Sequence, residues 1–281
     1  AGQYGTLLTD IQLRVDTQTR RVIRKTARNV VVQGEAFTGA QGPVPLTTAV
    51  PTFPADPGVQ KIIDTYRAAA IPLAQRPVGQ AQGAMRRQPN AALESVLGNL
   101  VADAQLLATR APEDGGAQLS FMNPGGLRAD LVPDEQGLVR YGQLYAVQPF
   151  GNQLVIKTFT GAQIRAVLEQ QFASGGNTVQ RPRVLSVSSG FSYRYDLSQP
   201  AGARISHMVL NGVPVTDTQS VRVVMSSFLD SGGDNFTVLT QGQDRRVGEL
   251  DLDALEAYFR LQSPVAPPAT NRITRVAPAA R

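Results

Sequence analysis

Apolar and polar residues alternate along the first part of the chain. The alternation runs through residues 8–15 and again through residues 21–25, and the polar residues 16–19 lie between the two runs. Successive side chains of a β-strand point to opposite faces, so two such runs around a short polar stretch predict a β-hairpin. Residues 34–57 are rich in Gly, Pro, Thr and Ala, which is typical of an irregular connection.

Apolar residues recur at helical spacing in four further stretches. They are residues 59–66, which follow an Asp-Pro start signal and end before Pro72, residues 91–109 with Asn90 as N-cap, residues 160–172, which begin with a capping box, and a stretch near residues 252–259. Gly98 lies inside the second of these helices. A glycine in a helix interior costs about 1 kcal/mol relative to alanine, so we expect close packing against another backbone segment at Gly98.

Short apolar or alternating runs between these helices predict strands. The runs are residues 118–122, 154–159, 184–187, 191–195, 204–210 and 221–225. Strands and helices follow one another in no regular order, which favours a layered α+β fold with a mixed sheet over a doubly wound one. The Pro/Ala-rich residues 263–281 predict an extended tail.

Composition limits the classes of function. The apolar fraction of 42% suits a globular protein, and no run of about 18 apolar residues predicts a membrane span. The first residues carry no signal-peptide pattern. The net charge of +5 comes mostly from arginine, whose planar fork suits an anionic ligand, although most arginines in a chain of this composition are solvated. Basic residues form no block interleaved with aromatics, so we expect no nucleic-acid binding.

The residue types needed for several kinds of catalysis are scarce. The chain has one histidine, His207, and no cysteine, so it cannot by itself build a multi-histidine metal centre. A serine triad needs a positioned histidine, and His207 lies in a predicted strand, where we expect a core or surface role. Asp230 and Asp234 lie in a glycine-rich turn but lack the ligand count of a calcium loop. Neither GxGxxG nor GxxxxGK[ST] occurs, which leaves dinucleotide and P-loop readings without support.

Three glycine-rich loops carry the candidate binding chemistry. They are residues 123–128, 149–152 and 228–236. Phe150 and Phe228 each adjoin glycine, and two such rings can clamp a base. Arg128 suits a phosphate or a sugar hydroxyl, and Asp234 can accept hydrogen bonds from two ribose hydroxyls. Each residue taken alone also has an ordinary structural explanation: a core ring, a solvated arginine, or favourable turn chemistry.

Taken together, these loops form a pattern that resembles the C-terminal domain of the 5'-nucleotidase family. The pattern comprises residues 93–104, 123–128, 141–152, 160–161 and 228–236, and the similarity covers about residues 80–260. The family also includes UDP-sugar hydrolases and cyclic-nucleotide phosphodiesterases. The resemblance implies a layered mixed-sheet α+β fold for residues 81–262.

The resemblance also assigns roles to individual residues. Phe150 and Phe228 would sandwich the nucleobase, and Asn123 would contact the nucleoside. Arg128 would hold the part of the substrate nearest the phosphate, and Asp234 the ribose hydroxyls. These assignments make a nucleotide or nucleoside the expected partner.

Two further positions are compared with the family pattern. Arg87 lies near the place where some members carry another substrate arginine, whereas Arg110 is out of register by one residue. Pro124 replaces the glycine more usual in its loop, and this change restricts the backbone there.

In the family, two divalent metal ions and a catalytic Asn-His pair lie in an N-terminal metallophosphatase domain. Neither an Asp-x-His nor an Asn-His sequence occurs in this chain. We therefore expect residues 1–33 to be the last segment of such a domain and residues 34–80 to be a linker with a helix. The chain alone would hold no cofactor and would be inactive. The resemblance implies a periplasmic, secreted or cell-surface location.

Two other interpretations remain open at this stage. The chain can be a free-standing, non-catalytic nucleotide-binding module, which a native start codon immediately before Ala1 would favour. The loops can also be packing turns of a purely structural domain, in which case no nucleoside would bind.

Overall fold

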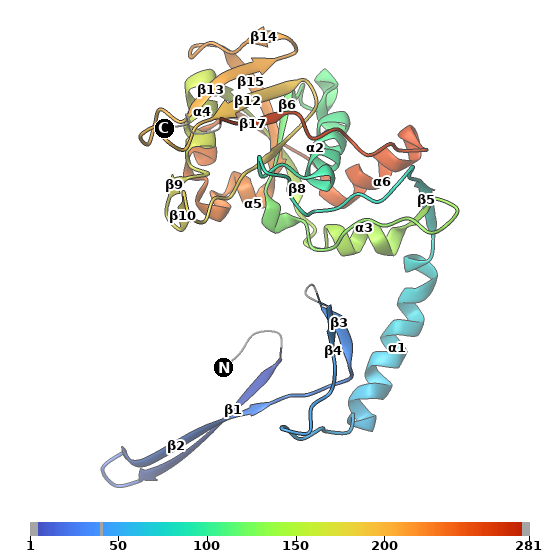
Figure 1. Cartoon of the computed structure of the whole chain (residues 1–281), viewed down its shortest axis with the longest axis vertical. Coiled ribbons are helices and arrows are strands. Elements are labelled where there is room, and N and C mark those ends of the chain that lie inside the picture. Colours follow the sequence, from blue (N-terminus) through green and yellow to red (C-terminus); the bar gives the residue numbers. More distant parts are fainter. Residues whose placement is uncertain (1–4, 40–41, 277–281) are drawn as a thin grey trace. The chain divides into compact units, whose positions relative to one another are not determined.

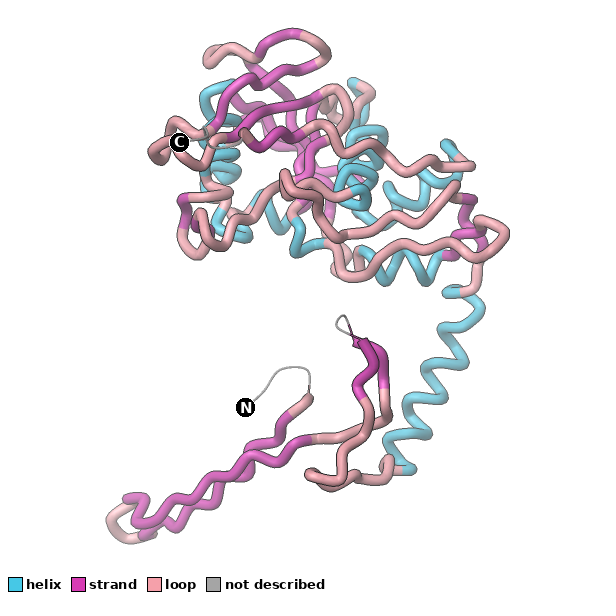
Figure 2. Tube along the Cα trace, in the orientation of Figure 1, coloured by secondary structure: helices cyan, strands magenta, loops and turns pink. Residues whose placement is uncertain are grey.

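The computed structural model describes residues 5–39 and 42–276, and its helices and strands are traced in Figures 1 and 2. The chain divides into two compact units, residues 1–69 and residues 70–281. The division falls inside helix α1 (Pro57–Ala74), whereas the sequence predicted a domain boundary at residues 80–81. Residues 1–4 of the expected metallophosphatase segment and residues 277–281 of the expected tail lie outside the described residues.

The first unit contains the predicted hairpin. Strands β1 (Leu7–Asp16) and β2 (Arg21–Val31) pair antiparallel. The Asp16 carboxylate accepts hydrogen bonds from the backbone N–H of Gln18 at 2.8 Å and of Thr19 at 3.2 Å, which fixes the turn between the strands. A second, short pair, β3 (Phe37–Gly39) and β4 (Gly42–Val44), lies in the predicted connection.

Helix α1 continues past Pro72, so the prediction that it ends before this residue is wrong. A proline removes the hydrogen bond that its own nitrogen would donate and crowds the carbonyl four residues earlier, but it does not block the hydrogen bonds donated by the residues that follow it. The carbonyl of Ile71 still accepts from the backbone N–H of Gln75 at 2.9 Å, so the last turn remains closed.

All of α1 is described, and none of its residues is buried. Ile11 of β1 and Ile62 of α1 illustrate the exposure of apolar side chains in the first unit, at 60% and 59%.

The second unit is built on a mixed five-stranded sheet in the order β11-β6-β15-β8-β16. The strands are β6 (Leu119–Met122), β8 (Gln153–Thr160), β11 (Ser186–Val187), β15 (Ser220–Ser226) and β16 (Gln243–Leu250). The central strand β15 runs parallel to β6 and antiparallel to β8. This arrangement confirms the predicted α+β fold with a mixed sheet.

Helices and a second sheet cover the two faces of this sheet. The helices are α2 (Val96–Thr109), α3 (Tyr141–Val147), α4 (Gly161–Glu169), α5 (Ser227–Asp230) and α6 (Asp251–Gln262). Alternate residues of β15 belong to different cores, because side chains of a strand alternate between faces. Val223 packs with α4 and the second sheet, whereas Val224 packs with Leu154 and Ala254 on the side of α6.

Helix α2 begins later than the sequence predicted. Its N-cap is Ser95, whose hydroxyl accepts from the backbone N–H of Gly98 at 3.1 Å, and not Asn90. The Asn90 side chain instead accepts from the backbone of Ala92 and Glu94, and so closes a turn before the helix. Close packing at Gly98 is confirmed, although the neighbour that a β-carbon would strike is the side chain of Ser186 and not backbone.

The second sheet has the order β14-β13-β12-β17. Its strands are β12 (Phe191–Tyr195), β13 (Ile205–Leu210), β14 (Val213–Pro214) and β17 (Ile273–Arg275). Strand β17 belongs to the stretch for which the sequence predicted an extended tail, yet it pairs parallel with β12 and buries Ile273. Two short pairs, β5 (Pro77–Gln80) with β7 (Leu138–Arg140) and β9 (Ala173–Ser174) with β10 (Asn177–Thr178), complete the unit.

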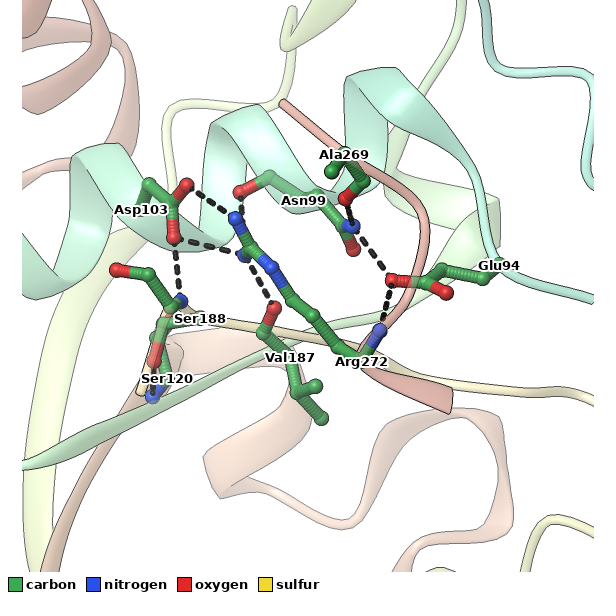
Figure 3. A network of polar contacts seen from close by, with 9 residues as sticks. Glu94, Asn99, Asp103, Ser120, Val187, Ser188, Ala269 and Arg272 are labelled. Carbon is green, nitrogen blue, oxygen red and sulfur yellow. Dashed lines mark hydrogen bonds and ion pairs between the residues drawn. The ribbon is translucent and has the colours of Figure 1, made fainter. Parts of the chain in front are cut away.

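A network of polar contacts fixes the segment that leads into β17 (Figure 3). The guanidinium of Arg272 donates to the two carboxylate oxygens of Asp103 at 2.8 and 2.7 Å and to the carbonyl of Val187 at 2.8 Å. The buried carboxylate of Glu94 accepts from the Asn99 amide at 2.6 Å and from the backbone N–H of Arg272 at 3.1 Å. The C-terminal segment is therefore part of the second unit as far as residue 276.

None of the helices in the described part of the chain has the length and hydrophobicity needed to cross a bilayer.

Candidate functional site

The strand directions bring the three glycine-rich loops to one edge of the large sheet. Strands β6 and β15 are parallel, so the loops that follow them, residues 123–128 and 227–236, leave the sheet at the same edge. Strand β8 is antiparallel to β15, with Leu154 opposite Ser226, so the loop that precedes it, residues 149–152, meets them there. Helix α6 starts at this edge too, because Leu250 at the end of β16 lies opposite Gln153.

These loops enclose a cavity of about 520 Å³. Its lining residues are Met122, Asn123, Gly125, Gly126, Arg128, Phe150, Asn152, Arg183, Ser226, Phe228, Asp234 and Asp251. Five of the six predicted site residues are among them: Asn123, Arg128, Phe150, Phe228 and Asp234. The sixth, Arg87, is not. Its backbone N–H donates to Asp130 Oδ1 at 2.9 Å, and its guanidinium lies 3.9 Å from the same oxygen.

Asp234 has a backbone conformation that few residues other than Gly, Asn and Asp adopt, with φ of 55° and ψ of 25°. The Asn177 amide donates to its carbonyl oxygen at 2.8 Å and so anchors this backbone. Its carboxylate accepts from Asn123 Nδ2 at 2.8 Å through Oδ2 and forms an ion pair with Arg183 through Oδ1. A carboxylate has about four acceptor positions, so both oxygens keep capacity for a ligand.

Two aromatic rings at the cavity remain open to solvent. Phe150 is 55% exposed and Phe228 is 43% exposed, although large apolar side chains are usually covered in a folded domain. The Arg128 guanidinium lies over the ring of Phe150, 5.8 Å from its centroid. The Phe228 ring rests on Gly233, where a β-carbon would come within 2.5 Å of it. The cavity thus offers exposed aromatic faces beside charged groups.

A buried ion pair supports the short helix that carries Phe228. Lys157 Nζ, from the middle of β8, lies 2.5 Å from Asp230 Oδ1 at the end of α5, and Arg245 Nε lies 2.9 Å from Asp230 Oδ2. The Lys157 side chain is only 6% exposed and that of Asp230 11%. The other end of α5 is capped by Ser226, whose hydroxyl accepts from the backbone N–H of Leu229 at 3.4 Å. Both ends of the helix are therefore held.

The cavity wall also contains an acidic group that the sequence did not single out. Asp251 is 2% exposed, and its carboxylate accepts from the Asn152 amide at 3.1 Å and from the backbone N–H of Leu252 at 2.9 Å. Burial raises the pKa of Asp251, and the hydrogen bond from Asn152 acts in the opposite direction. The pair joins the loop before β8 to the start of α6.

Of the lining residues that the prediction lacked, some were adjacent to the predicted loops. Asn152 ends the second loop, and Ser226 lies two residues before the third. Arg183 had no such signal, because it reaches the cavity from the irregular segment before β11. Pro124 occupies the first position of the one-turn 3₁₀ helix η2 (Pro124–Gly126), a position that proline tolerates.

No group of three or more His, Cys, Asp or Glu side chains that could hold a metal ion occurs among residues 5–39 and 42–276. The cavity is instead built from amide, carboxylate, guanidinium and aromatic groups. These groups bind and orient a polar ligand through hydrogen bonds, charge and ring contacts.

The fold and the site define a mixed α/β domain with a polar cavity, flanked by aromatic rings, at one edge of its sheet. The chain belongs to the family of the 5'-nucleotidase C-terminal domain, whose model matches residues 77–241. This match confirms the resemblance that the glycine-rich loops indicated.

Individual relatives agree with this family. The chain is 32% identical over 195 residues to the trifunctional nucleotide phosphoesterase protein YfkN of Bacillus subtilis, a match that covers 65% of this chain and 12% of that protein. It is 35% identical over 173 residues to a cell wall protein of Listeria monocytogenes, covering 60% of this chain and 21% of the relative. The crystal structure of a 5'-nucleotidase precursor from Thermus thermophilus matches 98% of this chain and 50% of its own, with 28% identity and a TM-score of 0.67.

The chain is therefore homologous to 5'-nucleotidase hydrolases and spans half the length or less of these three relatives. The structural match includes residues of the first unit as well as the second, since it covers nearly the whole chain.

Proposed function

We propose that this chain is the nucleotide-recognition part of a 5'-nucleotidase-like phosphohydrolase, which hydrolyses nucleotide phosphate esters to nucleoside and phosphate. The observation that carries the proposal is the convergence of Phe150, Phe228 and Asp234 on one cavity from two separate loops, residues 149–152 and 228–236. This combination suits a nucleoside, because a nucleoside has a flat base and a sugar with neighbouring hydroxyls.

In this proposal the two rings sandwich the base. Stacking of a base on an aromatic side chain contributes about 1 to 3 kcal/mol. Asp234 accepts hydrogen bonds from the ribose hydroxyls, and Asn123 contacts the nucleoside while it orients the Asp234 carboxylate. Arg128, which lies over the Phe150 ring, holds the part of the substrate nearest the phosphate. Tight binding of these remote groups would orient the scissile phosphate for attack.

We further propose that the chemistry belongs to an N-terminal metallophosphatase domain that joins this chain in the complete protein. Two divalent metal ions held there would activate the attacking water. Residues 1–33 would be the last segment of that domain, residues 34–80 the linker with its helix, and residues 81–262 the substrate-binding domain. The exposed apolar side chains of the first unit support this division, since apolar side chains on a hairpin usually pack against a partner. The chain alone would be inactive.

The proposed location is periplasmic, secreted or cell-surface. The similarity to a cell wall protein of Listeria monocytogenes supports it.

Calorimetric titration of the chain with adenosine and with adenosine 5'-monophosphate tests the proposed function. We expect both to bind the wild type, and Phe228→Ala to weaken binding by about fivefold to 150-fold, the loss of one stacking partner. Asp234→Ala should also weaken binding. Tyr145→Ala is a matched control, because this ring is 51% exposed and does not line the cavity. Absence of heat with every nucleoside and nucleotide tried would contradict the proposal.

A further inference from the structure

Arg183 brings a guanidinium group to the part of the cavity that contains Asp234. Its own backbone N–H donates to the carbonyl of Gln171 at 3.0 Å, and the next two residues, Val184 and Leu185, are buried in the core. The backbone of Arg183 is therefore fixed. Its side chain, in contrast, is 46% exposed and lines the cavity.

The guanidinium of Arg183 is only partly used by the protein. Nη1 contacts Asp234 Oδ1, and no other side-chain partner of Arg183 is found among the residues that the structure describes. Arg272 shows the contrast: its guanidinium contacts Asp103 through two nitrogens and also reaches the carbonyl of Val187. A guanidinium has five N–H donors, so most donors of Arg183 remain for a ligand.

Asp234 does not need Arg183 to be oriented. Its other carboxylate oxygen already accepts from Asn123 at 2.8 Å, and its carbonyl accepts from Asn177 at 2.8 Å. A neutral ribose next to Asp234 requires acceptors, which the carboxylate supplies. The Arg183 guanidinium is paired with Asp234 through one nitrogen only, so its other N–H donors can approach a phosphate, whose geometry the planar fork of arginine matches.

Gly125 leaves space beside this pair. A β-carbon on Gly125 would lie 3.3 Å from Asp234 Oδ2 and 3.8 Å from Arg183 Nη1, so the loop passes close to both groups without a side chain of its own. A ligand group that reaches Asp234 therefore also comes within reach of Arg183.

We propose that Arg183 is a specificity-determining residue that binds a phosphate on the 2' or 3' oxygen of the ribose. The ligands of this cavity would then be nucleosides or nucleotides that carry a phosphate on the 2' or 3' hydroxyl. The phosphate bound by Arg183 serves for recognition and is not the one that is hydrolysed. One guanidinium nitrogen stays with Asp234, while others donate to the phosphate. This inference rests on the proposed function, because it takes Asp234 as the acceptor for the ribose.

The test is calorimetric titration of the whole chain with four ligands: adenosine, adenosine 2'-monophosphate, adenosine 3'-monophosphate and adenosine 5'-monophosphate. For the wild type we expect the 2'- or 3'-phosphate to tighten binding about tenfold relative to adenosine, as a charge-assisted contact does. Arg183→Gln should remove this gain and weaken adenosine, which lacks the phosphate, less than it weakens the 2'- and 3'-monophosphates. Arg183→Gln should weaken binding of the 5'-monophosphate less than binding of the 2'- and 3'-monophosphates. Arg181→Gln is the control, since Arg181 is exposed, carries the same charge and does not line the cavity.

Three outcomes overturn the inference. The wild type gains nothing from a 2'- or 3'-phosphate although it binds adenosine, Arg183→Gln keeps the gain, or Arg183→Gln weakens all four ligands equally, which would make Arg183 a positioning residue for Asp234. Failure of the proposed function is distinguishable, because then the wild type binds none of the four ligands, adenosine included.

Discussion

The amide of Asn123 donates a hydrogen bond of 2.8 Å to Asp234 Oδ2, and these two residues are 111 positions apart in the sequence. Asn123 follows β6, and Asp234 lies in η3 (Gly233–Asn235) after β15. The parallel pairing of these strands brings the two loops together. One hydrogen bond thus connects the loops that carry the amide and the acidic group of the cavity.

Replacement of Asn123 by alanine should weaken nucleoside binding by about tenfold, because a hydrogen bond to a charged group contributes about 1.5 to 3 kcal/mol and part of its role is to orient Asp234. The effects of Asn123→Ala and Asp234→Ala should then be less than additive in the double variant, since both remove the same contact. Calorimetry of the three variants with adenosine measures this coupling. Fully additive losses would show that the two residues act independently.

Gly233→Ala should disturb the ring of Phe228. The new β-carbon would lie 2.5 and 2.6 Å from two ring atoms and 2.6 Å from the carbonyl oxygen of the same residue, so the ring must move. Such overpacking typically costs about 1 to 3 kcal/mol of stability, and we expect weaker nucleoside binding as well. Urea unfolding and calorimetry check both effects. Gly176→Ala is the control, because the nearest neighbour of its β-carbon, Asn235 Nδ2, would be 3.8 Å away.

Lys157→Met should destabilise the second unit, since among the described residues it leaves Asp230 with the exposed Arg245 as its one charged partner. Removal of one member of a buried ion pair costs about 3 to 5 kcal/mol, whereas an exposed pair contributes about 0 to 1 kcal/mol. We therefore expect a large loss of unfolding free energy for Lys157→Met and a small one for Arg245→Ala. Equal losses for the two variants would contradict the structural role assigned to the buried pair.

The pair Arg76–Glu256 should make stability depend on pH in the acid range. Two hydrogen bonds of 2.7 Å from the Arg76 guanidinium lower the pKa of Glu256, while burial acts in the opposite direction. A carboxyl group with a lowered pKa in the folded state binds fewer protons there than in the unfolded chain. Its contribution is present above its ordinary pKa of 4.5 and is lost as the pH falls through the lowered value.

Urea unfolding of the wild type and of Glu256→Gln between pH 6 and pH 3 measures this contribution. We expect the difference in stability between them to shrink as the pH falls. Arg76→Gln should remove most of this pH-dependent part, because it breaks the hydrogen-bonded pair and leaves Arg260, 3.8 Å from Glu256, as a weaker partner. A difference that stays constant over the whole range would contradict this assignment.

The hydrophobic pattern predicted the elements that bury an apolar face. The capping box at Thr160 begins α4 as expected, with hydrogen bonds of 2.9 and 3.2 Å between Thr160 and Gln163. The edge strand β16 was missed because its sequence is rich in charges and most of its residues are exposed, so it carries no alternation. Strand β17 was missed because it has only three residues and its parallel pairing with β12 comes from a tertiary contact.

The cavity residues, like the strands, could be predicted where the signal is local in sequence and not where it depends on tertiary packing. Glycine-rich loops with an aromatic or charged residue singled out Phe150 and Asp234 from local sequence, and the family resemblance added Asn123. The strand order brings the three residues to one cavity. Arg183 lies in no such loop and reaches the cavity only through the packing of the segment before β11. Arg87 was selected because it lies near the place of a substrate arginine in some family members; it contacts Asp130 and does not line the cavity.

The central claim is that Phe150, Phe228 and Asp234 together form a nucleoside site. The most direct measurement is a crystal structure of the chain with adenosine 5'-monophosphate. We predict the base between the rings of Phe150 and Phe228 and the ribose hydroxyls within hydrogen-bonding distance of Asp234. A nucleotide bound elsewhere, or an empty cavity at a saturating concentration, would contradict the account.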